Sequence, residues 1–331
     1  KDNYDESGFA KKIAHYLGTE HTEVLVSPSE VLRVIDSIAK VYSEPFSDSS
    51  QVPTNIICEN IKSQGISVAL TGDGADELFG GYSRHLLLPK VNKYFGNMPF
   101  YLRKLLVYFL QYYPISKNGL EVDKFQKLRS SILSAGKIED IYNSVKMIQN
   151  YTVNELCIFK ENNSEKVEKY YRYKTIEESL MISDILTYLH SDILVKLDRA
   201  SMFSSLETRA PFLDNRIAEI AWIIPLSLKI NKFKGKKSGK IILRRILSKY
   251  IPDKLLNRPK QGFTMPTGPW LKGPLKNWAK DLLSYETIKK QGFIDPKIVE
   301  TILNNHLNGS EDNTSRLWNI LMWQAWLNEW Y

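Results

Sequence analysis

The chain has 331 residues, a formal net charge of +8, 43% hydrophobic and 25% charged residues, and two cysteines. This length can bury a sizeable core, and the composition is that of an ordinary globular protein. The longest apolar runs are too short to cross a bilayer and no signal peptide opens the sequence, so we predict no membrane partner. Two isolated cysteines form no disulfide framework, which predicts a cytoplasmic location.

Residues 5–85 are predicted to alternate helices and strands. A helix over 5–17 stops at Gly18, and residues 22–26 are predicted as a strand. Residues 27–30, Ser-Pro-Ser-Glu, form a capping box that opens a helix reaching Pro45. Its expected apolar face consists of Leu32, Ile35, Ile38, Ala39 and Tyr42. A helix over 53–63 then leads into a buried strand over 67–70, and this order predicts an α/β fold with a mostly parallel sheet.

Later residues are predicted to be mainly helical. Residues 86–174 have amphipathic periods, and we expect helices packed beside the sheet with no further strands. Residues 175–178, Thr-Ile-Glu-Glu, form a second capping box, after which apolar steps of three and four predict one long helix through Leu197. A stripe from Leu317 to Trp326 is expected in the core. We therefore divide the chain into a βαβ part, residues 1–85, and a mainly helical part, residues 86–331.

The positive charge is densest in residues 229–240, KINKFKGKKSGK. The run holds a single aromatic residue, and no helix-turn-helix, zinc or ribonucleoprotein signature accompanies it, so we predict no nucleic-acid partner. Most of these lysines are expected in a solvated loop, and the rest would favour anionic ligands.

The most informative segment is residues 66–82, ISVALTGDGADELFGGY, in which an apolar strand runs into a glycine loop with three carboxylates. Ligands of parallel sheets bind at the C-terminal ends of strands, and the N–H groups of such a loop attract phosphate. The three acids would repel phosphate unless a divalent cation lay between them. The loop therefore predicts a nucleotide and Mg²⁺ site, and the alternative is a simple Asp-Gly hairpin turn.

Segment 66–82 resembles the synthetase domain of the asparagine synthetase family, and three further blocks carry the same resemblance in the family's order. They are residues 44–54, EPFSDSSQVPT, residues 196–214, which open with KLDRASM and close with ETRAPFLD, and residues 257–263, NRPKQGF. The resemblance covers nearly the whole chain. It implies a parallel sheet of the adenine-nucleotide hydrolase-like type with a large helical C-terminal part.

The resemblance also implies a reaction. Aspartate would be amidated to asparagine through an aspartyl-adenylate, with ATP and Mg²⁺ as cofactors, release of AMP and pyrophosphate, and ammonia or glutamine as the nitrogen source. A homodimer is a further expectation. One alternative is a related amidotransferase or β-lactam synthetase-like enzyme that acts on another carboxylate, and another is a non-catalytic domain.

Two parts of the family pattern do not occur in these residues, namely the Ser-Gly-Gly-x-Asp-Ser pyrophosphate loop and the N-terminal glutaminase domain. Asp48-Ser-Ser50 matches half of that loop motif without its glycines, and we expect it to line the substrate side. We therefore expect the 331 residues by themselves to be inactive, with the glutaminase domain as a partner supplied elsewhere.

The resemblance assigns roles to particular residues. Those expected to contact the nucleotide are Leu70, Thr71, Gly72 and Lys240; those expected to act in catalysis are Asp73, Lys260 and Arg199; and Asp76 is the expected Mg²⁺ ligand. Glu77 is either a site residue or a partner of the helix dipole.

The remaining candidate residues can be interpreted as structural. For Lys196 and Arg199 the plain alternative to a site role is an ion pair with Asp192 and Asp198, and Arg209 is expected to give structural support. The histidines show no metal spacing and no nucleophile elbow is present, which argues against hydrolase and zinc chemistry.

Overall fold

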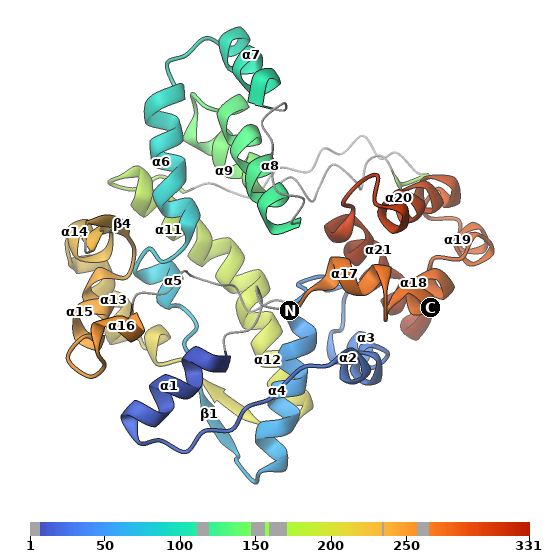
Figure 1. Ribbon diagram of the computed structural model, residues 1–331, viewed down its shortest axis with the longest axis horizontal. Coiled ribbons are helices and arrows are strands. Elements are labelled where there is room, and N and C mark those ends of the chain that lie inside the picture. Colours follow the sequence, from blue (N-terminus) through green and yellow to red (C-terminus); the bar gives the residue numbers. More distant parts are fainter. Residues whose placement is uncertain (1–6, 111–118, 147–155, 159–170, 234, 257–264) are drawn as a thin grey trace.

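The computed structural model describes residues 7–110, 119–146, 156–158, 171–233, 235–256 and 265–331 (Figure 1). Its first elements follow the predicted order, and both expected helix punctuation signals are present. Ser27 accepts a hydrogen bond from the Glu30 N–H while the Glu30 carboxylate accepts one from Ser27, and Gly18 has a φ of 66°. These elements are α1 (Ser7–Leu17), α2 (Pro28–Ile35), α3 (Ile38–Val41), α4 (Gln51–Ser63), β1 (Val68–Leu70) and α5 (Ala75–Leu78).

Two details of this N-terminal part differ from the prediction. Residues 22–26 are not a strand, because no strand among the described residues pairs with them, although Val24 and Val26 pack on the core while Leu25 is exposed. The predicted helix to Pro45 is broken between α2 and α3. Within α2 the predicted apolar face is also wrong in part, because Leu32 is exposed whereas Val31 and Val34 are buried.

The strand β1 pairs in parallel with β2 (Glu207–Arg209), and Ala69 lies opposite Thr208. The expectation that strands end at residue 82 is therefore wrong, because β1 finds its partner far along the chain. A short hairpin follows, formed by β3 (Asn231–Phe233) and β4 (Lys236–Ser238), where a solvated loop was expected. The described residues thus form an α/β fold with a small parallel sheet.

Strand β1 is not buried as predicted. Ala69 packs beside Cys58, Ala200 and Leu206, but Val68 is 42% and Leu70 is 74% exposed. Successive side chains of a strand point to opposite faces, and only one face of this sheet is covered within the described residues.

The helices α6 (Ser83–Phe95), α7 (Phe100–Leu110), α8 (Gly119–Leu133) and α9 (Ile138–Lys146) form a second layer with its own core. They pack on one another and on α11 (Ile176–Asp184), at the far end of the molecule from β1 (Figure 1), and not beside the sheet as expected. The predicted long helix is continuous, but its middle third is the π-helical segment η2 (Ile185–Ile193), which leads into α12 (Leu194–Phe203).

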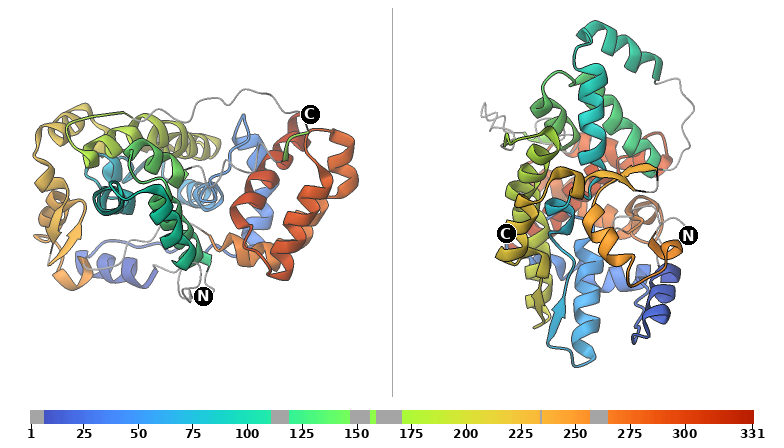
Figure 2. Two further views of the ribbon diagram at one scale, coloured as in Figure 1. Left: turned by 90° about the horizontal axis from the view of Figure 1, so that it is seen from above. Right: turned by 90° about the vertical axis from the view of Figure 1, so that its left-hand side faces the viewer.

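The C-terminal half supplies two further groups of helices that lie at opposite ends of the molecule (Figure 2). One group surrounds the hairpin and consists of η3 (Pro211–Leu213), α13 (Asn215–Ile223), α14 (Leu226–Lys229), α15 (Ile241–Leu247) and α16 (Asp253–Leu256). The other consists of α17 (Thr267–Lys272), α18 (Lys276–Leu282), α19 (Tyr285–Gln291), α20 (Pro296–Asn308) and α21 (Thr314–Trp330).

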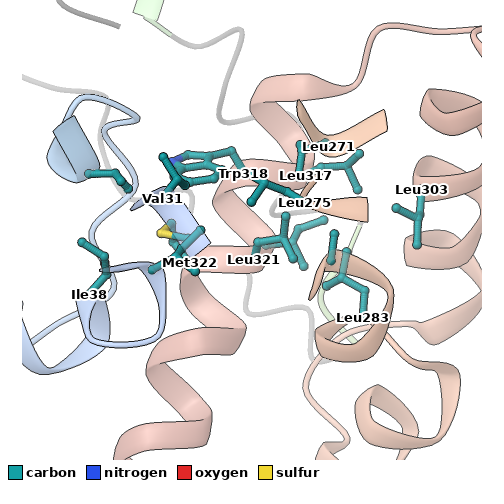
Figure 3. Close-up of a cluster of buried hydrophobic side chains, with 14 of the residues drawn as sticks. Val31, Ile38, Leu271, Leu275, Leu283, Leu303, Leu317, Trp318, Leu321 and Met322 are labelled. Carbon is teal, nitrogen blue, oxygen red and sulfur yellow. The ribbon is translucent and has the colours of Figure 1, made fainter. Parts of the chain in front are cut away.

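The largest core joins this last group to the N-terminal part. Figure 3 shows Trp318 and Met322 of α21 beside Val31 and Ile38, which confirms the predicted core role of the C-terminal stripe. The contact is reinforced by the Trp330 indole N–H, which donates to the carbonyl of Ala39 over 2.9 Å. Within the described ranges, no helix is both long and apolar enough to cross a membrane.

Candidate functional site

The glycine loop follows the C-terminal end of β1 and is fixed by the segment that follows β2. The Thr71 N–H donates to the carbonyl of Arg209 over 2.8 Å, which extends the parallel ladder by one residue. Gly74 then turns with a φ of 87°, a conformation that favours glycine, and a Cβ there would overlap the side chain of Leu213. The loop conformation therefore depends on a glycine at residue 74.

The loop brings two of the predicted site residues together. The ammonium nitrogen of Lys240 lies 2.9 Å from a carboxylate oxygen of Asp76, at the start of α15. The Lys240 N–H donates to the carbonyl of Phe79 over 2.9 Å. A Cβ at Gly239 would overlap the carbonyl oxygen of Gly80, so the two backbone turns can approach only because Gly239 has no side chain.

The other predicted residues divide into three groups. Leu70 at the end of β1 and Gly72 on the loop are exposed, and Asp73 on the loop is half-buried. Arg199 is exposed on α12, next to the exposed Asp198. Lys260 lies outside the described residues, so its position relative to Asp73 and Asp76 stays a prediction. The hydroxyl of Thr71 is buried and has no hydrogen-bond partner in the described part of the chain.

Glu77 is the buried member of the three loop acids. It is 1% exposed and accepts a hydrogen bond of 2.5 Å from the hydroxyl of Tyr82. Burial raises the pKa of Glu77, although the Tyr82 hydrogen bond opposes the shift. Glu77 is thus a buried acceptor as well as an acid in the first turn of α5.

A buried ionic cluster lies directly behind this loop, and the sequence interpretation missed it. One oxygen of Asp184 accepts hydrogen bonds from Arg84 and His85, each over 2.7 Å, and the other oxygen accepts from Tyr142 over 2.8 Å. The Arg84 guanidinium also lies 3.9 Å from the ring centre of Tyr82. Burial opposes ionisation of Asp184, but its hydrogen bonds from His85 and the charge of Arg84 lower its pKa to about 2.

His85 is fully buried, and burial lowers its pKa below the usual value, outweighing the hydrogen bond to Asp184. A neutral ring that donates from Nε2 leaves Nδ1 as an unprotonated acceptor, which agrees with the lack of a hydrogen-bond partner for that nitrogen among the described residues. Arg84 already balances the charge of Asp184, so a second cation is not required. The cluster joins α6, α9 and α11 behind the loop.

A second ion pair joins α12 to the segment just ahead of α4. The Lys196 ammonium donates to Asp48 and to the hydroxyl of Ser50, both over 2.8 Å, while Asp48 accepts from the Ser50 N–H. Burial opposes the charge of Asp48, but Lys196 lowers its pKa below the usual value. The plain alternative for Lys196 was an ion pair with Asp192, one helical turn away, and the structure pairs it with Asp48.

Arg209 and the basic run have local roles. The Arg209 side chain is exposed and pairs with Glu207 over 2.7 Å, and only its backbone carbonyl contacts the loop. Lys229 is fully buried, whereas Lys232, Lys236 and Lys237 are exposed on the hairpin. Most of the basic run is therefore solvated, as expected.

The described residues offer few side chains that could together bind a metal ion. Among the described residues, no cluster of three or more His, Cys, Asp or Glu side chains could hold a metal ion. The one loop acid assigned to Mg²⁺, Asp76, instead faces Lys240.

The chain belongs to the asparagine synthase family, whose model matches residues 1–328. It is 28% identical to asparagine synthetase 1 of Bacillus subtilis over 98% of this chain and 50% of that protein. It is 29% identical to a putative asparagine synthetase of Mycobacterium tuberculosis over 98% of this chain and 49% of that protein. The amidase chry2 of Gibberella zeae is 23% identical over 93% of this chain and 48% of that protein.

The match to the asparagine synthetases falls on their C-terminal synthetase domain. The chain spans about half the length of the curated relatives it matches. The comparisons thus establish a synthetase domain of the asparagine synthase family, as the sequence motifs predicted.

Proposed function

We propose that this chain is the synthetase part of an enzyme that amidates a carboxylate at the expense of ATP, and that the carboxylate is the side chain of aspartate. The observation that carries the proposal is the pair of Asp76 and Lys240, 2.9 Å apart at the C-terminal end of β1. That end of a parallel strand is where ligands bind in α/β folds. The proposal includes a sheet of the adenine-nucleotide hydrolase-like type and a functional division of the chain near residue 85.

The loop residues fit MgATP by their chemistry. Mg²⁺ prefers carboxylate oxygens, and Asp76 would supply one. The ammonium of Lys240 suits a phosphate oxygen, and Leu70, Thr71 and Gly72 would contact the nucleotide. Asp76 and Lys240 now neutralise each other, so nucleotide binding would exchange this pair for a metal ion and a phosphate. Mg²⁺, when bound, would neutralise charge as pyrophosphate leaves.

The remaining residues would position two anions for reaction. An oxygen of the substrate carboxylate would bond to the α-phosphorus while the bond from that phosphorus to pyrophosphate breaks, giving the acyl-adenylate. Ammonia would then attack the acyl carbon, and AMP would leave. We assign Lys260 to the developing phosphate charge, Asp73 to the reacting centre and Arg199 to the substrate carboxylates.

The proposal extends to parts of the relatives that this chain does not match. Ammonia would come from glutamine through a glutaminase domain, and a homodimer in the cytoplasm is the proposed working state. The 331 residues by themselves would be inactive, because the pyrophosphate loop of the family does not occur in them.

A second candidate function is the same ATP-dependent amidation of a carboxylate other than that of aspartate. Its basis is that relatives of this chain are not all named asparagine synthetases: chry2 of Gibberella zeae and chyE of Penicillium rubens are named amidases and are 23% and 24% identical to this chain. The residues that would choose the acid are Ser47, Ser49, Gln51 and Arg199. Of these, Gln51 is fully buried and donates to the carbonyl of Phe46 over 2.8 Å.

A chimera tests the proposal. The half of Bacillus subtilis asparagine synthetase 1 that this chain does not match would be joined ahead of residue 1, and the product supplied with ATP, Mg²⁺, ammonium and aspartate. We expect asparagine, AMP and pyrophosphate in equal amounts. A folded chimera that binds ATP and forms pyrophosphate with a different acid would support the second candidate, and one that binds no ATP would contradict both.

A further inference from the structure

The exposed side of α7 is almost entirely apolar. Six of its residues are large, apolar or aromatic, and between 40% and 68% exposed: Phe100, Tyr101, Leu102, Leu105, Tyr108 and Phe109. Lys104 is the one charged residue among the exposed positions of this helix. The opposite side is apolar too, because Leu106, Val107 and Leu110 pack into the core of α6 to α9. A helix that is apolar all round is normally covered on all sides.

The sequence around α7 carries only positive charge. Residues 78–120 contain no Asp or Glu and six Lys or Arg. On α6, which precedes α7, Lys90 and Lys93 are exposed and Tyr94 is 69% exposed. The surface therefore combines aromatic and leucine side chains with lysines.

The position of α7 separates it from the candidate site. The helix forms one extremity of the molecule, at the top of Figure 1, whereas β1 and its loop lie far below it. A partner that covers α7 therefore leaves the loop around Asp76 and Lys240 accessible.

The charge pattern favours a lipid surface over a second copy of this chain as the occupant of α7. A second copy related by a two-fold axis would place the same surface against itself, so that Lys104 and its neighbours would face like charges. An anionic lipid surface attracts nearby lysines and accepts Tyr, Phe and Leu side chains at the boundary of headgroups and acyl chains. A short helix at an extremity also suits a flat surface better than the grooves used in most helix recognition.

We propose that α7 docks this protein on anionic membrane surfaces, with Leu105, Tyr108 and Phe109 in the interface and Lys104 among the lipid headgroups. The helix has 11 residues, so it would lie on the bilayer and not cross it. The proposal departs from the sequence-based expectation of no membrane partner, which rested on the lack of a spanning segment. It does not depend on the proposed enzymatic function.

The test is co-sedimentation of the 331-residue chain with vesicles of phosphatidylcholine alone or mixed with phosphatidylglycerol. We expect binding to the mixed vesicles, weaker at high salt because surface charges are screened. Leu105→Glu should reduce that binding at least tenfold. The matched control is Ile220→Glu on α13, since Ile220 is 52% exposed like Leu105, and it should bind as the parent does.

Three results would overturn the proposal. The first is no binding of the parent chain to the mixed vesicles, and the second is an equal loss of binding in both variants. The third is a concentration-dependent dimer in sedimentation velocity that Leu105→Glu dissolves, together with no vesicle binding, which would assign α7 to a second copy. Circular dichroism of both variants checks that they fold.

Discussion

The ammonium of Lys240 and the carboxylate of Asp76 lie 2.9 Å apart, although one precedes α15 and the other is in the first turn of α5. Their side chains are 29% and 24% exposed, and ion pairs accessible to water contribute about 0–1 kcal/mol. The pair is therefore a minor source of stability. Its importance for the proposed function is that it holds a carboxylate and an ammonium group beside the glycine loop.

The close approach of two backbone turns holds this pair, and glycine substitutions test it. Gly239→Ala should destabilise the chain, because its Cβ would overlap the carbonyl oxygen of Gly80 and backbone would have to shift. Gly72→Ala should leave folding unchanged, because no atom lies within 4 Å of a Cβ built there. Thermal unfolding of both variants measures the difference, and equal melting temperatures would contradict the close approach.

Gly72→Ala also serves the functional proposal. If the backbone of Gly72 contacts the nucleotide, the variant should fold normally in the chimera and yet bind ATP more weakly. Calorimetric titration with ATP would report the change, and unaltered affinity would remove Gly72 from the nucleotide site.

The Asp184 cluster should dominate the stability of the helical layer. Asp184→Asn keeps the size of the side chain but leaves the Arg84 guanidinium without its counter-charge in a buried place. Removal of one partner from a buried ion pair costs about 3–5 kcal/mol. Urea unfolding measures this loss. The matched control is Glu207→Gln, which removes the exposed pair with Arg209 and should leave the unfolding midpoint unchanged.

Several successes of the sequence interpretation rest on local signals. The capping box at Ser27 and the glycine loop after β1 depend on residues within a few positions of one another, so pattern and spacing suffice to predict them. The assignment of Lys240 to the nucleotide came from family resemblance and stays a prediction, while the structure shows its contact with Asp76.

The sequence-based predictions that proved wrong concern contacts that only the tertiary structure decides. Lys196 has Asp192 one helical turn away, but it pairs with Asp48 just ahead of α4, because packing of α12 against α4 decides which acid it reaches. Strand β1 likewise finds its partner in β2, which no local pattern marks as its neighbour. The buried cluster had a weak signal in Asp184, an acid inside an otherwise apolar run, but its partners Arg84 and His85 could not be predicted.

Buried histidine makes the stability depend on pH. Burial lowers the pKa of His85, so the unfolded state binds a proton first as the pH falls. The contribution of His85 is fully present above about pH 6.5 and is lost as the pH falls toward its folded pKa. Asp184 affects stability at a lower pH. Its pKa is about 2 in the folded state, so its contribution to stability is lost as the pH falls below about 4.

The melting temperature should therefore fall between pH 7.5 and pH 5.5, and His85→Gln should reduce that fall, since glutamine can still donate to Asp184 but does not titrate. Part of the fall in melting temperature should remain in this variant, because burial also lowers the pKa of His306. A variant with the same pH slope as the parent chain would show that His85 is not the group that responds.

The metal assignment of Asp76 can be separated from its pairing with Lys240. In the chimera, Asp76→Asn removes a hard anionic ligand and keeps the size, so the Mg²⁺ concentration for half-maximal activity should rise about tenfold, which corresponds to about 1.4 kcal/mol of metal binding. Lys240→Met should instead raise the KM for ATP and leave the Mg²⁺ requirement unchanged, because a cation near phosphate does not bind the metal. Titrations of activity with Mg²⁺ at saturating ATP distinguish the two variants. If both variants shifted only the KM for ATP, Asp76 would serve to hold Lys240 in place and the metal would be bound by other residues.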